Sequence, residues 1–138
     1  MPTDIDASDR LPRTRCYDCF RPLADCVCAS IPVIRNRTDV LLLQHRRERF
    51  HPFNTARLVR RSLSNSTFLV DHTRRLAERL ELKPHAGLLF PGSDATLLAD
   101  LPADRRPEQL VIVDGTWHQA KTLVRDIPAL RALPQFRL

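Results

Sequence analysis

The sequence predicts an α/β protein with a mainly parallel sheet flanked by helices and a small metal-binding module near its N-terminus. Short continuous apolar runs, typical of strands buried on both faces, alternate with helical patterns along the chain. The four cysteines of the chain lie close together near its N-terminus. A length of 138 residues fits one domain with at most a small appended module.

Residues 1–15 contain mostly polar and charged residues, so we expect a flexible N-terminus. This segment lacks the apolar centre of a secretory signal. No apolar run approaches the ~18 residues that suggest a membrane span. We therefore expect a cytoplasmic protein without membrane association.

The cysteines lie in the spacing C-x2-C-x6-C-x-C, at Cys16, Cys19, Cys26 and Cys28. Paired cysteines this close in sequence can present four sulfur ligands to one tetrahedral ion. Disulfides explain the cluster less well in a cytosolic chain, and four unrelated cysteines or a redox pair would also produce it. We predict a structural zinc knuckle over residues 16–30.

The first strand is predicted at residues 39–45, followed by a basic loop and a helix over about residues 54–64. Asn54 or Thr55 is a good N-cap for this helix. A second strand is expected at residues 66–70. A helix at residues 74–83, stopped by Pro84, and a strand at residues 86–90 follow. Phe90-Pro91 then begins a rigid turn, either an edge of a ligand pocket or an ordinary connection.

The charge balance favours RNA as a partner. Lys and Arg number 22 against 16 Asp and Glu, giving a formal net charge of +6, and nearly all of the cations are arginine. Arginine matches phosphate geometry and stacks on bases. Arg57, Arg60 and Arg61, spaced i, i+3, i+4 on the first helix, project together. They form either a solvated helix face or a phosphate clamp, and we predict the RNA-binding role.

After a polar loop at residues 100–108, the strand predicted at residues 110–113 runs into Asp114-Gly115-Thr116-Trp117 and a helix to about residue 125. Strand-to-helix junctions are where open α/β sheets bind ligands. The structural alternative is that Asp114 or Thr116 caps the helix and Trp117 fills the core. An apolar stripe supports partial burial of the indole: Trp117, Ala120, Val124 and Ile127.

The C-terminal residues 135–138 are predicted to begin a further strand. The chain has no G-x-G-x-x-G and no P-loop, and its three glycines exclude a glycine-rich phosphate cradle. Neither a dinucleotide-binding Rossmann site nor a nucleoside triphosphatase is therefore supported.

Together these motifs resemble the DTW-domain family, named for the Asp-x-Thr-Trp motif that stands here at residues 114–117. The resemblance covers roughly residues 16–134, because the order of the motifs matches as well as the tetrapeptide. The matching motifs are the cysteine cluster, Asn54-Thr55-Ala56-Arg57-Leu58, Phe90-Pro91, Asp114–Trp117 and Gln119-Ala120.

The resemblance implies an enzyme, a tRNA-uridine aminocarboxypropyltransferase. Such enzymes move the 3-amino-3-carboxypropyl group of S-adenosylmethionine to N3 of a tRNA uridine and release methylthioadenosine. The family is similar in fold to the SPOUT class of knotted α/β enzymes. We therefore expect a SPOUT-like sheet, tRNA as partner, no catalytic metal and no obligate protein partner.

The resemblance also implies roles for the matching residues. Asp114 is either the base for the N3 proton or a group that holds the amino group of the transferred chain, and Trp117 stacks on adenine or on the target base. Arg57 contributes bidentate contacts to a carboxylate or a phosphate. The predicted cofactor-binding residues are Asn54, Thr55, Phe90, Pro91, Asp114, Gly115, Thr116 and Trp117.

Family members continue past the point where this sequence ends, at Leu138. We therefore expect residues 31–138 to form a DTW domain that lacks the C-terminal knot region. Two other functions stay open: a non-catalytic, zinc-stabilised RNA-binding remnant of the family, and a SPOUT-like RNA methyltransferase.

Overall fold

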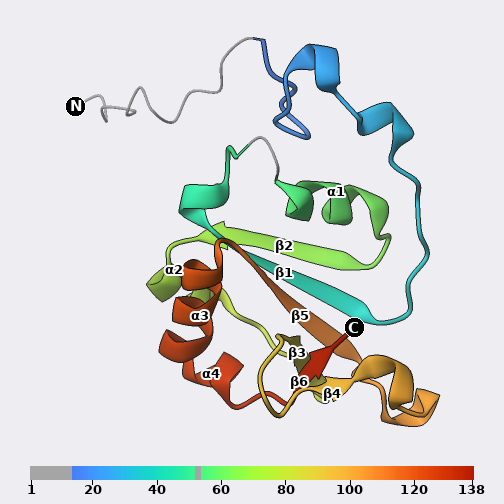
Figure 1. The fold of residues 1–138 in the computed structure, drawn as a ribbon, viewed down its shortest axis with the longest axis vertical. Coiled ribbons are helices and arrows are strands. Elements are labelled where there is room, and N and C mark those ends of the chain that lie inside the picture. The colour runs from blue at the N-terminus through green and yellow to red at the C-terminus, as the bar shows by residue number, and fades with distance from the viewer. Residues whose placement is uncertain (1–13, 52–53) are drawn as a thin grey trace.

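The computed structural model describes residues 14–51 and 54–138, arranged as Figure 1 shows. The N-terminal segment expected to be flexible, residues 1–15, lies almost entirely outside these described residues. Across the described ranges one sheet carries helices on both faces, and the cysteine-rich segment lies next to the first helix. None of the described helices combines the length and hydropathy needed to cross a bilayer.

The sheet has the strand order β2-β1-β5-β3-β6-β4, and its paired strands run parallel, which confirms the predicted α/β class. The apolar runs at the centre of the sheet form β1 and β5, because strands covered on both faces exclude water from every residue. The short strand β4 was not anticipated. The strands are β1 (Asp39–His45), β2 (Ser66–Asp71), β3 (Ala86–Leu89), β4 (Thr96–Leu97), β5 (Gln109–Asp114) and β6 (Gln135–Arg137).

Helices cover the two faces unequally. α1 lies on one face, and α2, α3 and α4 lie on the other (Figure 1). Short 3-10 turns complete the connections, at Leu23–Asp25, Cys28–Ser30, Arg46–Glu48, Leu98–Asp100 and Ala103–Arg105. The α-helices are α1 (Thr55–Ser62), α2 (Thr73–Arg79), α3 (Trp117–Asp126) and α4 (Pro128–Arg131).

The main hydrophobic core lies between the sheet and α2, α3 and α4. Alternate residues of β1 and β5 face opposite sides of the sheet, so one set enters this core and the other faces α1. The largest contributions come from leucine and isoleucine side chains with no exposed surface or almost none. The buried cluster consists of Leu41, Leu43, Leu76, Leu88, Val111, Leu123, Val124, Ile127 and Leu130.

The helix predicted at residues 74–83 is shorter than expected. α2 ends at Arg79, and Leu80 is extended, with φ −69° and ψ 118°. Leu80 and Leu82 pack against the core, and the backbone N–H of Lys83 donates a hydrogen bond to Gln109 Oε1 at 3.0 Å. Contacts with the sheet therefore override the local helical pattern before Pro84 is reached.

The predicted apolar stripe of α3 also needs correction. Ala120, Val124 and Ile127 are buried as expected, but Trp117 is 54% exposed and does not belong to the core. Leu123, which is completely buried, lies there instead. Trp117 is the first residue of α3 and directly follows the β5 turn, so its side chain projects at the edge of the sheet rather than over it.

Candidate active site at the carboxyl ends of the strands

The carboxyl ends of β1 and β5 lie side by side, with Gln44 opposite Asp114 in the strand register. The chain leaves β1 toward α1 on one face and leaves β5 toward α3 on the other (Figure 1). In open α/β sheets, connections that diverge in this way open the crevice in which ligands bind. Asp114 therefore lies at the point of the sheet where a binding site is expected.

The turn from β5 into α3 is closed by a capping box. The Thr116 hydroxyl accepts a hydrogen bond from the Gln119 backbone N–H at 3.2 Å, and Gln119 Oε1 accepts one from the Thr116 backbone N–H at 2.8 Å. A Cβ atom at Gly115 would lie 2.9 Å from Gln119 Oε1 and 3.1 Å from Gln119 Cβ. Glycine therefore leaves room for the capping box, and Thr116 is the helix cap.

Asp114 is half-buried and belongs to a hydrogen-bond network. Nε2 of Gln44 donates to Asp114 Oδ2 and to Asn54 Oδ1, both at 2.8 Å. Gln44 has no exposed surface, and Asn54 is almost completely buried. The network connects the end of β1, the start of α1 and the end of β5, so three segments meet around this carboxylate.

Phe90, which follows β3, forms a stacked pair with Trp117. The ring centroids are 5.4 Å apart and the ring planes differ by 8°. The Lys121 ammonium group lies 4.9 Å from the centroid of the indole ring. Because half of Trp117 is exposed, its ring has surface left for contact with a planar ligand.

The residues predicted to bind the cofactor come together at this edge of the sheet. They belong to three segments: the start of α1, the end of β3 and the turn between β5 and α3. These segments contribute Asn54 and Thr55, Phe90 and Pro91, and Asp114, Gly115, Thr116 and Trp117, respectively.

The predicted RNA-binding arginines share one surface of α1, where this helix meets the cysteine-rich segment. Arg57, Arg60 and Arg61 line a cavity of about 280 Å³ together with Tyr17 and Asp18. Arg61 forms an ion pair with Asp18 at 2.8 Å. The i, i+3, i+4 spacing thus places three guanidinium groups around a single hollow.

Arg57 is more enclosed than the other two arginines. Its guanidinium carbon lies 4.4 Å from the ring centroid of Phe20 and 5.0 Å from that of Phe68. Its buried Nε has no hydrogen-bond partner among the described residues. Burial lowers the pKa of Arg57, and the nearby charges of Arg60 and Arg49 lower it further. Arg57 therefore joins the cysteine-rich segment to β2 by packing, whereas Arg60 is exposed.

The four cysteine sulfurs form one cluster, with all Sγ atoms within 4.8 Å of one another. Cys16 and Cys28 are 3.7 Å apart at sulfur, and Cys19 and Cys26 are 4.0 Å apart. A tetrahedral ion with sulfur ligands at ~2.3 Å requires sulfur–sulfur distances of about 3.8 Å. The cysteines, all free thiols, are therefore positioned to bind a metal ion.

The environment of the cluster favours thiolate at one position and opposes it at another. Hydrogen bonds from the backbone N–H groups of Cys19 and Asp18 lower the pKa of Cys16 to about 7. Burial raises the pKa of Cys28 to about 12, followed by hydrogen bonds with the other cysteines. The four thiols therefore do not ionise together without a cation, and metal binding must displace protons.

His45, at the end of β1, is held neutral by its surroundings. Burial lowers the pKa of His45, and the charges of His72 and Arg47 lower it further, against a smaller opposing effect of Glu48. Its Nδ1 accepts a hydrogen bond from the Arg47 backbone N–H at 3.2 Å, which requires an unprotonated nitrogen. The His72 ring contacts it edge to face at 5.9 Å.

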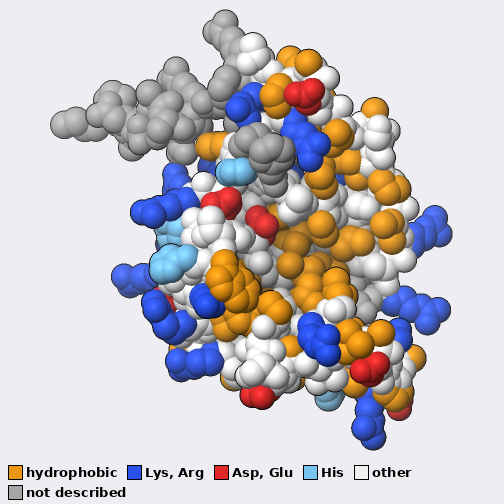
Figure 2. All heavy atoms as spheres, viewed as in Figure 1, with side chains coloured by type: hydrophobic (Ala, Val, Ile, Leu, Met, Phe, Trp, Pro, Cys, Tyr) orange, Lys and Arg blue, Asp and Glu red, His pale blue; other side chains and the backbone are white. Residues whose placement is uncertain are grey.

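The surface around this edge is basic. Figure 2 shows Lys, Arg and His side chains along the side of the molecule formed by α2 and α3, while hydrophobic side chains occupy the middle of the view. Exposed cations on the segments that follow the strand ends include Arg46, Arg47, Arg74, Arg75 and Lys121. The candidate site thus lies beside a positively charged rim.

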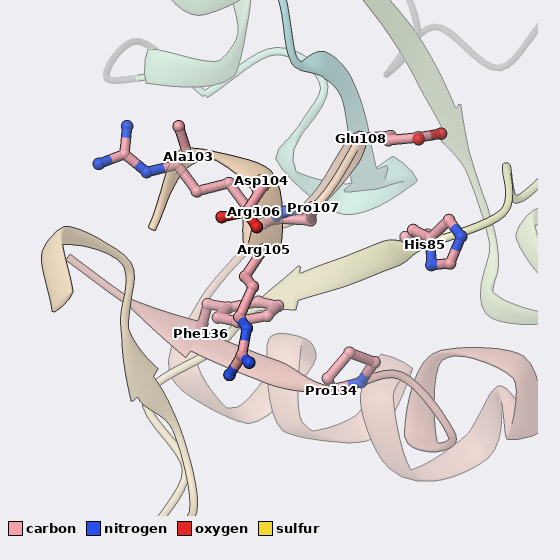
Figure 3. A pocket seen from close by; sticks show the side chains of 10 residues that line it. His85, Ala103, Asp104, Arg105, Arg106, Pro107, Glu108, Pro134 and Phe136 are labelled. Atoms are coloured by element: carbon pink, nitrogen blue, oxygen red, sulfur yellow. The ribbon is translucent and has the colours of Figure 1, made fainter. Parts of the chain in front are cut away.

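A separate cavity of about 680 Å³ lies at the opposite edge of the sheet, near the amino end of β3 (Figure 3). His85, Arg105 and Phe136 are among the residues that line it, and none of the predicted site residues does so. The groups carried by the sequence motifs therefore lie at the carboxyl edge, away from this cavity.

Sequence reasoning missed Gln44, Gln119 and Tyr17. Gln44 had a visible signal, because it is a polar residue near the end of an otherwise apolar strand. Gln119 completes the capping-box pattern Thr-x-x-Gln that begins at Thr116. The position of Tyr17 beside the arginines depends on how the cysteine-rich segment packs, which local sequence does not specify.

Comparisons with known proteins agree with the sequence motifs. A family model described as the DTW domain matches residues 13–138. The chain is 29% identical over 136 residues to tRNA-uridine aminocarboxypropyltransferase 2 of Drosophila melanogaster, covering 91% of this chain and 54% of the relative. It is 30% identical over 122 residues to the protein of that name from Mus musculus, covering 80% and 41%.

A plant relative, tRNA-uridine aminocarboxypropyltransferase A of Arabidopsis thaliana, is 30% identical over 148 residues, covering 91% of this chain and 54% of the relative. The chain thus spans about half the length of the curated relatives it matches. No solved structure matches it with significant similarity. Because the family model extends over nearly the whole sequence, this chain belongs to the DTW-domain family.

Proposed function

We propose that this protein is an S-adenosylmethionine-dependent tRNA-uridine aminocarboxypropyltransferase. Its family and the names of its relatives support a transferase that modifies tRNA. The observation that carries the proposal is the meeting of the Asn54, Phe90 and Asp114–Trp117 segments where the connections of β1 and β5 diverge. The proposed substrates are S-adenosylmethionine and a tRNA uridine.

The proposed reaction is a displacement at the carbon next to the sulfonium. The uridine N3 forms a bond to the γ-carbon of the aminocarboxypropyl group, the carbon–sulfur bond breaks, and methylthioadenosine leaves as a neutral thioether. The N3 proton is released in the same step, so a nearby carboxylate assists. Asp114 is the acceptor in this proposal or holds the ammonium group of the transferred chain, and Trp117 stacks on adenine or the uracil ring.

The remaining roles follow the positions of the side chains. Phe90 supports Trp117 through their stack, and the backbone around Gly115 and Thr116 forms the floor beneath the ligand. Arg60 and Arg61, with the enclosed Arg57 beside them, contact RNA phosphates. Thr55 and Pro91 complete the cofactor edge.

We further propose that residues 16–30 are a structural zinc knuckle attached to a DTW domain formed by residues 31–138. The sulfur–sulfur distances of the four-cysteine cluster support a tetrahedral ion. With all four ligands supplied by the protein, the metal would stabilise the knuckle and take no part in the reaction.

The test is to incubate the protein with S-adenosylmethionine and tRNA and to identify the released product by mass spectrometry. Methylthioadenosine supports the proposal, whereas S-adenosylhomocysteine indicates a methyltransferase. Asp114→Ala should abolish release and leave tRNA binding nearly intact, and the matched control is Asp104→Ala, an exposed aspartate at the opposite edge. A folded, metal-loaded protein that binds tRNA but releases neither product indicates the RNA-binding remnant.

A further inference from the structure

We propose that Gln44 is a positioning residue for Asp114 and that Asn54 fixes the orientation in which Gln44 acts. The inference rests on the proposed function, because it assigns a role within the same site. It follows from the direction of each hydrogen bond in the network between β1, α1 and β5.

The orientation of the Asn54 amide is determined by the backbone around it. Asn54 Oδ1 accepts a hydrogen bond from the Arg57 backbone N–H at 3.3 Å, as the N-cap of α1. Asn54 Nδ2 donates to the backbone carbonyls of Arg49 at 3.1 Å and Glu48 at 3.3 Å. A backbone N–H can only donate and a carbonyl can only accept, so the oxygen and nitrogen of Asn54 cannot be exchanged.

The orientation of Gln44 follows from that of Asn54. Gln44 faces Asn54 Oδ1 and Asp114 Oδ2, both acceptors, at 2.8 Å each. A flipped Gln44 amide would place its own oxygen against these two oxygens. Its NH2 group must therefore point to both, with one hydrogen for each, which uses its full donor capacity.

The consequence is a carboxylate with one oxygen anchored. Asp114 Oδ2 is held by a donor whose own position is locked in the buried network, while Oδ1 accepts no hydrogen bond within the described residues. A reacting or ligand-binding group held in a single orientation saves the entropy of arranging it during the reaction. Asn54, whose polar atoms are all engaged within the protein, contributes to the site through Gln44.

The fold supplies a matched pair at the other end of the same two strands. Gln109 on β5 lies opposite Asp39 on β1, and Gln109 Nε2 donates to Asp39 Oδ2 at 3.1 Å. Both residues are buried, as Gln44 is. This pair lies at the amino edge, away from Asp114, so it provides the same chemistry without a place in the proposed site.

The experiment compares Gln44→Met with Gln109→Met in the full chain, measuring thermal unfolding, tRNA affinity, and kcat and KM for methylthioadenosine release. We expect both variants to unfold at lower temperature, because each leaves a buried acceptor unpaired. Gln44→Met should lower kcat by about 10- to 100-fold with tRNA affinity unchanged within about twofold. Gln109→Met should keep kcat within about twofold.

A second variant covers the case in which Gln44→Met does not fold. Asn54→Ser keeps a hydroxyl that can cap α1 but no longer dictates the orientation of Gln44, so kcat should fall while the fold is retained. Wild-type turnover in Gln44→Met and Asn54→Ser, alongside an inactive Asp114→Ala, would overturn the inference and leave the proposed function standing. A wild-type protein that releases no methylthioadenosine overturns the proposed function and, with it, this role.

Discussion

The indole ring of Trp117 stacks on the phenyl ring of Phe90, with 5.4 Å between centroids and 8° between planes. The pair joins the segment after β3 to the first turn of α3, two parts of the chain that local sequence does not connect. Since Trp117 is the only tryptophan in the sequence and is half exposed, its fluorescence reports directly on this edge.

We expect S-adenosylmethionine to change the fluorescence of Trp117 in a saturable way, because an adenine that stacks at this edge alters the environment of the indole. Phe90→Leu should weaken the response by removing one stacking partner. A parallel calorimetric titration gives the affinity independently. Calorimetric binding without any fluorescence change would show that the ligand lies away from Trp117.

The capping box at the start of α3 predicts an effect on stability. Thr116→Ala removes the hydroxyl that accepts the Gln119 N–H, and should lower the free energy of unfolding by about 1 kcal/mol, measured by denaturant titration. Thr122→Ala is the matched control, since its hydroxyl only bonds to the His118 carbonyl within the helix. An equal loss in both variants would argue against a special role for the cap.

The cysteine cluster predicts metal content and metal-dependent stability. Purified protein should contain near one zinc per chain by elemental analysis, and chelation should lower the unfolding temperature because the folded site binds the ion and the unfolded chain does not hold it in place. Cys19→Ser should have the same effect as chelation. A metal-free protein that stays stably folded would contradict the zinc assignment.

The two environments of the arginines predict different consequences of removing them. Arg57→Ala should destabilise the fold by about 2 kcal/mol, because it removes a guanidinium packed between Phe20 and Phe68. Arg60→Ala should leave stability nearly unchanged, weaken tRNA binding, and reduce the slope of log affinity against log salt by about 1. Thermal unfolding and filter binding at several salt concentrations distinguish these effects.

The environment of His45 predicts a loss of stability in acid. Its pKa is lowered below 6.5 in the folded protein, so the unfolded chain takes up a proton that the folded chain does not. The stability contributed by neutral His45 is fully present above about pH 6.5 and is lost as the pH falls toward the folded pKa.

His45→Asn, which keeps an acceptor for the Arg47 N–H without a titrating group, should flatten the stability profile between about pH 6.5 and pH 5. The control is His118→Asn, an exposed position on α3. Thermal unfolding across this range measures the effect. A His45→Asn profile that matches the wild type would exclude His45 as its origin.

The sequence by itself determined the parallel α/β class, the cysteine cluster and the strand-to-helix junction at Asp114. Each depends on residues close together in the chain: apolar runs that fix strands, cysteine spacing that fixes possible ligands, and a Thr-x-x-Gln pattern that begins a helix. These local interactions act whatever the rest of the fold does.

Only the tertiary structure decided which side chains meet. The end of α2 at Arg79, the exposure of Trp117 and the enclosure of Arg57 all depend on contacts with segments distant in sequence. The hydrogen bonds of Gln44 to Asn54 and Asp114 follow from strand order and register, because parallel pairing sets which residues lie opposite each other. Local propensity contains no information on that pairing, so the support of Asp114 emerges only in the folded chain.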